Sequence, residues 1–352
     1  MKIDRILVIG ACGQIGTELT VALREKYGRY NVIAADKKIT ADILLDVMDH
    51  EELSNVVREC SVTQIYHLAA MLSANGEQNA DAAWKLNVGG LLNVLKVAKE
   101  RKLDKVFWPS SIAVFGLGSP KYNCPQNTRI EPNTVYGISK RAGEYWCNYY
   151  YEKYGVDVRS LRFPGLISYT ALPGGGTTDY AVDIFHQALE KQYYTCFLSE
   201  DNCLPMMYMP DAIRATLELM DTPKEKISIR TSYNLAGMSF APCDLAAEIE
   251  KYIPDFKISY EPDYRNAIAN SWPASIKDDN ARKDWGWEPA YNLESMTSDM
   301  LEKLSIMKGM PVLLSSGNSQ EEFQPLAHET LHSLLGTANS LREVTKTHVI
   351  NE

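Results

Sequence analysis

The chain has 352 residues, of which 45% are hydrophobic and 23% are charged, and its formal net charge is −9. This composition is typical of a globular protein with a large core, and the negative charge argues against a nucleic-acid surface. No apolar run reaches the roughly 18 residues that a membrane-spanning helix needs, so we expect no membrane partner.

The first predicted element is a strand over 5–9, a β-branched apolar run typical of a strand buried on both faces. It enters a glycine-rich turn directly, and an amphipathic helical stretch follows over 17–27. This order is the context of a dinucleotide-binding loop, whose backbone approaches a pyrophosphate at the helix N-terminus, although a purely structural joint is the alternative. The predicted cofactor contacts in this loop are Gly10, Gly13, Gln14, Ile15 and Gly16.

A second predicted strand, over 31–35, ends in Asp36. An acid at this place accepts hydrogen bonds from the adenosine ribose and repels a 2′-phosphate, which favours NAD over NADP. Lys37 and Lys38 weaken this preference, because either side chain can reach a 2′-phosphate.

A third short run, over 42–47, places Asp46 and Val47 at the predicted adenine end of the site. Asp46 either accepts a hydrogen bond from the adenine amino group or caps the next predicted helix, over 51–60. The residues themselves leave both roles open.

Short apolar runs and helical stretches continue to alternate. A strand and its exit over 64–70 precede a long helix over about 80–101, and further strands follow over 104–109 and 158–163. This alternation predicts an α/β protein with a doubly wound parallel sheet, the Rossmann fold. Ligands of such sheets lie beyond the carboxyl ends of the strands. At such ends we predict cofactor contacts from Leu68, Ala69 and Ala70.

A second motif is Tyr136-x-x-x-Lys140. In a helix, residues four apart share a face, so the phenol and the ammonium point the same way. A nearby cation lowers the pKa of a tyrosine from its usual value of about 10, which makes the phenol a usable general base.

Together these motifs resemble the extended short-chain dehydrogenase/reductase family over about the first 300 residues. The resemblance rests, in chain order, on Gly10-x-x-Gly13-x-x-Gly16, Asp36, His67-Leu68-Ala69-Ala70, Asn87, Ser110-Ser111, Tyr136-x-x-x-Lys140 and Arg162-Phe163-Pro164-Gly165. It implies NAD as the cofactor, with Asn87 and Pro164 as further contacts, although an amide in a helix can also satisfy backbone groups.

The same resemblance implies the roles of the catalytic residues. Tyr136 is expected to be the acid/base, Ser111 to bind the substrate oxygen, and Lys140 to hold the nicotinamide ribose and lower the tyrosine pKa. It also implies a homodimer that forms through helices over about 80–101 and 133–154.

After residue 165 the alternation loosens. We predict a NAD-binding Rossmann domain over 1–165 with returns at about 206–236, a smaller C-terminal substrate-binding lobe over 166–310, and a tail over 311–352. Pro164 stands where similar sugar-nucleotide epimerases carry an asparagine, and the run 206–211, Met-Met-Tyr-Met-Pro-Asp, stands where they carry an Arg-Asp pair before a helix. Losing these polar groups suits a small substrate without a phosphate.

The glycine-rich segment 174–179 precedes a predicted helix and offers N–H and hydroxyl donors to a small anion, or else simply caps that helix. With Ser271-Trp272-Pro273, it resembles the metal-independent threonine dehydrogenases within the short-chain family. That resemblance implies L-threonine as the substrate and no metal. The predicted substrate contacts are Ser73, Ser111, Tyr136, Thr177, Thr178, Asp179 and Trp272.

Two other functions remain as alternatives: a nucleotide-sugar epimerase or dehydratase, and a non-catalytic NAD-binding sensor. The tail contains the segment 328–332, His-Glu-Thr-Leu-His, which matches a zinc-protease pattern, but no other feature supports a protease and we interpret it as a surface helix.

The sequence also bears on the location of the protein in the cell. Seven scattered cysteines without a Cys-x-x-Cys pair, and an apolar run from the start of the chain, predict a soluble intracellular protein with no signal peptide. We expect it in the cytoplasm, or in mitochondria if the source is eukaryotic.

Overall fold

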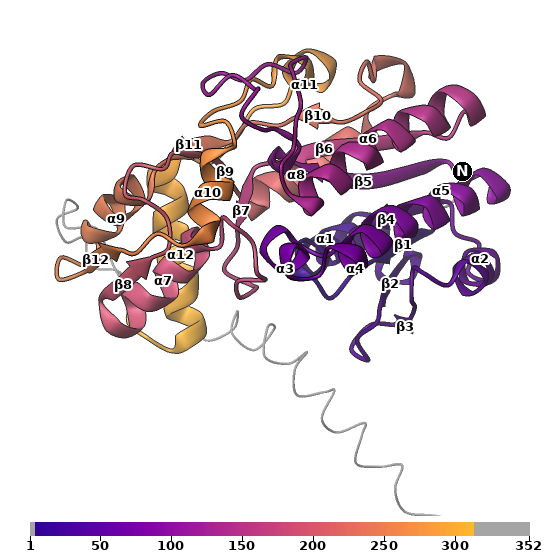
Figure 1. The fold of residues 1–352 in the computed structure, drawn as a ribbon. Coiled ribbons are helices and arrows are strands. Elements are labelled where there is room, and N and C mark those ends of the chain that lie inside the picture. The colour runs from indigo at the N-terminus through magenta and orange to yellow at the C-terminus, as the bar shows by residue number, and fades with distance from the viewer. Residues whose placement is uncertain (1–3, 313–352) are drawn as a thin grey trace, which may run out of the picture. The chain divides into compact units, whose positions relative to one another are not determined.

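The computed structural model describes residues 4–312, and its centre is a seven-stranded parallel sheet (Figure 1). The strand order is β3-β2-β1-β4-β5-β6-β10. The strands are β1 (Ile6–Ile9), β2 (Val32–Asp36), β3 (Ile43–Leu44), β4 (Gln64–His67), β5 (Lys105–Ser111), β6 (Val158–Phe163) and β10 (Tyr233–Asn234). This is the order of a doubly wound dinucleotide-binding sheet, so the predicted fold class is confirmed.

Helices cover both faces of this sheet. One face carries α1 (Gln14–Tyr27), α8 (Met209–Asp221) and α11 (Asp279–Trp285), and the other carries α2 (His50–Glu59), α5 (Gly90–Arg101) and α6 (Val135–Tyr154). In β1, Ile6 and Val8 join the first apolar cluster, while Leu7 and Ile9 join the second. Both faces are therefore buried, which explains why this strand is apolar at every position.

The remaining strands and four helices form a second group, on the left of Figure 1. A three-stranded sheet contains β7 (Gly165–Ile167), β9 (Leu204–Tyr208) and β11 (Met238–Phe240), and β8 (Tyr193–Cys196) pairs with β12 (Lys257–Tyr260). The helices are α7 (Tyr180–Lys191), α9 (Pro242–Glu250), α10 (Tyr264–Asn270) and α12 (Leu293–Lys308). Their apolar side chains build a third cluster.

The long helix predicted over 80–101 is confirmed, and a π-helical turn lies inside it. It consists of α4 (Ala80–Trp84), a π-helical turn over Lys85–Gly89, and α5, while a short helix that the sequence did not indicate, α3 (Ser73–Gln78), precedes it. A Cβ on Gly90 would lie 3.0 Å from Val47, so glycine lets α5 approach the segment after β3 closely. Single π turns of this kind occur inside α-helices, often near functional sites.

The described residues belong to one compact unit, so the boundary between a Rossmann domain and a substrate lobe near residue 165 stays a prediction. Within residues 4–312, none of the helices combines the length and the apolar character needed to span a membrane. The tail motif over 328–332 lies outside the described residues.

Candidate active site

The turn between β1 and α1 has the shape of a dinucleotide loop. Gly10 has φ +84°, and a Cβ there would lie 2.7 Å from the Ala69 nitrogen, so only glycine fits. A Cβ on Gly16 would lie 2.2 Å from the Gly10 oxygen and would clash with it. Because glycine has no Cβ, the helix can pack closely against its own loop. No side chain caps α1, so its first N–H groups remain available to a bound anion.

Three neighbouring cavities form a continuous trough along the ends of the strands. The first, of about 230 Å³, lies between Asp36 and Ala70, and the second, of about 650 Å³, shares Ala70 and Gly13 with it. The third, of about 130 Å³, shares Gln14 and Leu72 with the second and extends to Tyr136. A trough of three connected parts along a glycine loop fits an elongated dinucleotide.

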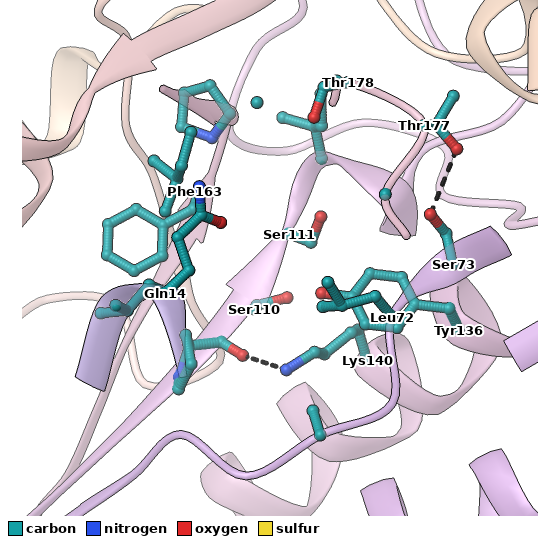
Figure 2. Close-up of a pocket in the computed structure, with 18 of the residues that line it drawn as sticks. Gln14, Leu72, Ser73, Ser110, Ser111, Tyr136, Lys140, Phe163, Thr177 and Thr178 are labelled. Atoms are coloured by element: carbon teal, nitrogen blue, oxygen red, sulfur yellow. Dashed lines mark hydrogen bonds between the residues drawn. The ribbon is translucent and has the colours of Figure 1, made fainter. Parts of the chain in front are cut away.

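The first turn of α6 brings the predicted catalytic groups together (Figure 2). Thr134 caps the helix by accepting a hydrogen bond from the Gly137 nitrogen at 3.0 Å. A Cβ on Gly137 would lie 2.1 Å from the Ala113 oxygen, so this glycine lets the helix rest on the turn that follows β5. Tyr136 therefore lies beside Ser111, at the end of β5, and both line the third cavity.

Lys140 stands one helical turn beyond Tyr136 and is buried. Its Nζ donates a hydrogen bond of 2.6 Å to the Pro109 oxygen and lies 4.6 Å from the centre of the Trp108 ring. Burial lowers the pKa of Lys140 to about 7, although Cys147 and Glu144 oppose this shift. The ammonium is therefore costly at this depth, as desolvation of a charged form requires.

The pKa of Tyr136 moves in the direction opposite to the one expected from its spacing to Lys140. Burial of the phenol raises it to about 12, and the Ser111 hydroxyl only partly offsets this. The Lys140 amino group, directed at Pro109, is not among the causes of the shift. In this structure the phenol is thus protonated at neutral pH, so a general base here needs a further positive influence.

A buried ionic network, which the sequence did not indicate, holds these elements in place. Glu144 has no exposed side-chain surface, and its carboxylate accepts hydrogen bonds from the Ser110 hydroxyl at 2.8 Å and from Arg162 at 2.7 and 2.9 Å. Ser110 precedes Ser111, and Glu144 follows Lys140 by one turn. The spacing 136–140–144 on one helical face was the available signal, because it placed an acid on the buried side.

The far wall of the third cavity comes from α3 and the glycine-rich segment 174–179. Ser73 Oγ lies 3.1 Å from Thr177 Oγ1, as Figure 2 shows. The Asp179 carboxylate accepts hydrogen bonds from the Gly175 and Gly176 nitrogens, both at 2.8 Å, and burial raises the pKa of this acid. Trp272 closes the wall; its buried Nε1 has no hydrogen-bond partner among the described residues.

The cavities gather most of the residues predicted for the site. The catalytic and substrate residues that line the third cavity are Ser73, Ser111, Tyr136, Lys140, Thr177, Thr178, Asp179 and Trp272. The cofactor residues that line one or more of the three are Gly10, Gly13, Gln14, Ile15, Asp36, Asp46, Val47, Leu68, Ala69, Ala70 and Pro164. Their individual roles remain predictions.

Two predicted cofactor residues lie behind the walls of the trough. Gly16 packs against the loop, and Asn87 donates to and accepts from the Met71 backbone and bonds Ser139 Oγ at 3.1 Å. Asn87 thus follows the alternative interpretation, in which its amide satisfies backbone groups. The sequence also missed Pro109, whose carbonyl orients Lys140, because a backbone acceptor leaves no signal in the side chains.

A doubly wound sheet, a glycine loop that fits a dinucleotide, and a Ser-Tyr-Lys cluster at the end of its trough define the site of a dinucleotide-dependent oxidoreductase. Comparisons with known proteins agree: the sequence profile of the NAD dependent epimerase/dehydratase family matches residues 6–236. The chain belongs to this family, and NAD is its cofactor. An uncharacterized epimerase/dehydratase of Staphylococcus aureus is 47% identical over 310 residues, which cover 85% of this chain and 96% of that protein.

Solved structures give more specific neighbours. A GalE-like L-threonine dehydrogenase from Cupriavidus necator, in its holo form, is 57% identical with a TM-score of 0.84, covering 86% of this chain and all of the other. The L-threonine dehydrogenase from Clostridium difficile is 46% identical with a TM-score of 0.85, covering 88% and 100%. A UDP-glucose 4-epimerase from Thermotoga maritima, at 19% identity and a TM-score of 0.74, covers 86% and 99% and shares only the fold.

The buried amino group of Lys140 yields a testable effect on stability. Replacing it in Lys140→Met should raise the free energy of unfolding by on the order of a few kcal/mol below pH 7, because the variant no longer buries a charge. In the folded protein the pKa is about 7 against 10.5 without burial, so between these values the unfolded chain holds more protons. The advantage of the variant should therefore shrink as the pH rises from 7 to 10.5.

Urea unfolding from pH 6 to 10 measures this difference. Lys96→Met, which removes an exposed lysine of α5, is the matched control and should leave stability nearly unchanged at every pH. A Lys140→Met variant that is less stable than the wild type at pH 6, or an advantage independent of pH, contradicts the interpretation.

Proposed function

We propose that this protein is an NAD-dependent L-threonine 3-dehydrogenase, which oxidises the C3 hydroxyl of L-threonine to give 2-amino-3-ketobutyrate and NADH. The observation that best supports this proposal is the third cavity, in which Ser111 and Tyr136 face a wall with neutral hydrogen-bonding groups. Its volume of about 130 Å³ lies below the roughly 300–1,000 Å³ typical of drug-sized ligands. The threonine dehydrogenases among the solved neighbours, at 46–57% identity, support the same substrate.

The charges of the cavity suit a small amino acid. Among the described residues, Lys140 is the one Lys or Arg on its wall, and Lys140 is directed at Pro109. A carboxylate would therefore be bound by neutral donors, for which Thr177, Thr178 and the unpartnered indole N–H of Trp272 are available. Asp179, whose pKa is raised by burial, would gain a cationic partner in the substrate ammonium.

The mechanism assigns one task to each catalytic group. Tyr136 takes the proton of the C3 hydroxyl, and Ser111 donates a hydrogen bond to the same oxygen, which fixes its orientation. Lys140 would hold the nicotinamide ribose, and the positive charge that favours the phenolate over the phenol would come from the oxidised nicotinamide ring when NAD is bound. NAD, when bound, supplies the acceptor for the hydride that leaves C3.

A nucleotide-sugar epimerase remains the second candidate. Such an enzyme needs cationic or amide groups to bind a diphosphate, whereas Pro164 and the neutral residues of the segment 176–178 occupy this wall. The likeness to the UDP-glucose epimerase extends to the fold alone. A non-catalytic sensor would have no use for the Ser111, Tyr136 and Lys140 cluster.

An absorbance assay tests the substrate. Purified protein with L-threonine and NAD should produce NADH, while UDP-sugars should give no turnover. The rate should be higher at pH 9 than at pH 7, because the pKa of Tyr136 is raised to about 12 and its base form grows with pH. Tyr136→Phe should lower kcat by at least about 100-fold, the usual contribution of an acid/base group.

The control is NAD affinity, measured by quenching of tryptophan fluorescence. It should change little in Tyr136→Phe, because only the hydroxyl is removed. No NADH from threonine with protein that binds NAD would refute the substrate, and substantial turnover by Tyr136→Phe would refute the role of the tyrosine.

We also propose that two copies associate through α4, α5 and α6, as the family resemblance implies. Exposed apolar side chains follow one stripe of α6, at Ile138, Tyr145, Trp146 and Tyr149, and Trp84 of α4 is exposed too. Such a patch favours association. One solved neighbour, at 49% identity, is described as a monomeric L-threonine 3-dehydrogenase, so the proposed dimer rests on the exposed patch and on the family resemblance.

Sedimentation velocity tests this association. The wild type should sediment as a dimer, and Trp146→Glu should shift it to the monomer, because a carboxylate would be buried without a partner. Val21→Glu changes an equally apolar, exposed residue of α1 and should remain dimeric. A monomeric wild type, or a dimer that tolerates Trp146→Glu, argues against this interface.

The last part of the proposal concerns where in the cell the protein acts. The 47% identical relative described above comes from the bacterium Staphylococcus aureus, which supports action in the bacterial cytoplasm. Cell fractionation with an antibody would test this, and enrichment in the membrane or the medium would contradict it.

A further inference from the structure

The adenosine end of the trough contains two carboxylates rather than one. Asp36, at the end of β2, accepts hydrogen bonds from the Cys12 nitrogen at 2.9 Å and from the Lys38 nitrogen at 3.1 Å. These two backbone groups fix the carboxylate on the wall of the first cavity. An acid held this way repels a 2′-phosphate directly.

The second carboxylate, Asp46, lies on the same wall and is fixed by different partners. One oxygen accepts a hydrogen bond from the Met48 nitrogen at 2.9 Å, and the other lies 2.9 Å from Lys37 Nζ. The hydrogen bond from the Met48 N–H is the main reason that the pKa of Asp46 is lowered, and the positive charges of Lys37 and Lys85 lower it further. The carboxylate is therefore ionised at neutral pH, and it neutralises the lysine that follows Asp36.

Lys37 is placed where a 2′-phosphate would need a cation. It follows the ribose-binding acid directly, lines the same cavity, and keeps 70% of its side chain exposed, so it can swing. Lys38 lines the cavity as well, but its Nζ is directed at the Cys12 oxygen, 3.5 Å away. The two lysines therefore differ: only Lys37 is paired with an acid whose removal would release it.

We propose that cofactor selection rests on both carboxylates, in which Asp36 repels a 2′-phosphate and Asp46 withholds Lys37 from it. Asp46 is then a second specificity residue, and Lys37 is a latent ligand for the 2′-phosphate of NADP. This inference depends on the use of NAD by the family and is independent of the substrate proposed above.

The test measures dinucleotide binding, without turnover, by isothermal titration at low salt. Asp36→Ser removes the direct repulsion of the 2′-phosphate. Asp46→Asn removes the negative charge of residue 46 but keeps the shape of its side chain and the oxygen that accepts the hydrogen bond from the Met48 nitrogen. The double variant should bind NADP roughly three- to fivefold more tightly than Asp36→Ser alone, the range expected for freeing an exposed ion pair. The gain is judged as the ratio of NADP affinity to NAD affinity, because Asp46 is also a predicted adenine contact and the loss of that contact would weaken both dinucleotides equally.

Two further lysine substitutions test whether the gain in NADP affinity depends on Lys37. Adding Lys37→Met to the double variant should abolish the gain in NADP affinity, whereas adding Lys38→Met should leave the gain in place. If Asp46 and Lys37 act through one charge pair, the effects of their two substitutions on NADP affinity should not be additive.

Three outcomes overturn the inference. They are a gain that survives Lys37→Met, an Asp46→Asn change that leaves NADP affinity unaltered, and a change that is equal for NAD and NADP. A wild-type chain that binds NAD but does not oxidise threonine would overturn only the proposed substrate, so the two failures can be distinguished.

Discussion

The Glu144 carboxylate joins the three elements that carry the reacting groups. It stands on α6 one turn beyond Lys140, accepts a hydrogen bond from Ser110 at the end of β5, and forms a two-pronged pair with Arg162 of β6. A carboxylate with no exposed surface is tolerated only when every partner stays in place, because an unpaired buried charge costs several kcal/mol. The register of helix and sheet, and with it the position of Ser111 beside Tyr136, is therefore fixed from behind the cavity rather than from within it.

The same network extends to the segment between α10 and α11. Arg162 also donates to the Asn234 side chain at 2.9 Å, and Asn234 donates to the Lys277 oxygen at 3.1 Å. Lys277 lies five residues after Trp272, which closes the substrate cavity. These hydrogen bonds therefore connect β6 to the backbone five residues beyond Trp272. Such networks specify a single arrangement when all members are satisfied, which suits a cavity whose two walls come from different parts of the chain.

Local patterns predicted the parts of the site that depend on neighbours in sequence. The glycine loop, the acid at the end of β2 and the Tyr136–Lys140 spacing each follow from one element and its period. Contacts between distant segments were not predictable: Ser73 and Thr177 were named separately, but their 3.1 Å contact depends on where α3 lies. The direction of the pKa shift of Tyr136 was wrong because a helical spacing says nothing of burial depth. The burial of Tyr136 depends on the apolar cluster against which it packs, and that cluster combines segments far apart in the sequence.

Lys140 and Asp179, the two side chains on the wall of the third cavity that are ordinarily charged at neutral pH, both lose charge through burial. The pKa of Lys140 falls to about 7 and that of Asp179 rises, so each moves toward neutrality. Groups with environments of this kind are typical of reacting sites, since a charge that is costly in the protein alone is stabilised by a ligand of opposite sign. A zwitterionic substrate offers an ammonium to Asp179 without bringing a phosphate that would need an arginine. Under the proposed function the cavity would select its substrate because it offers no cation for a phosphate: its neutral donors would bind one small carboxylate, whereas a diphosphate would remain without a positively charged partner.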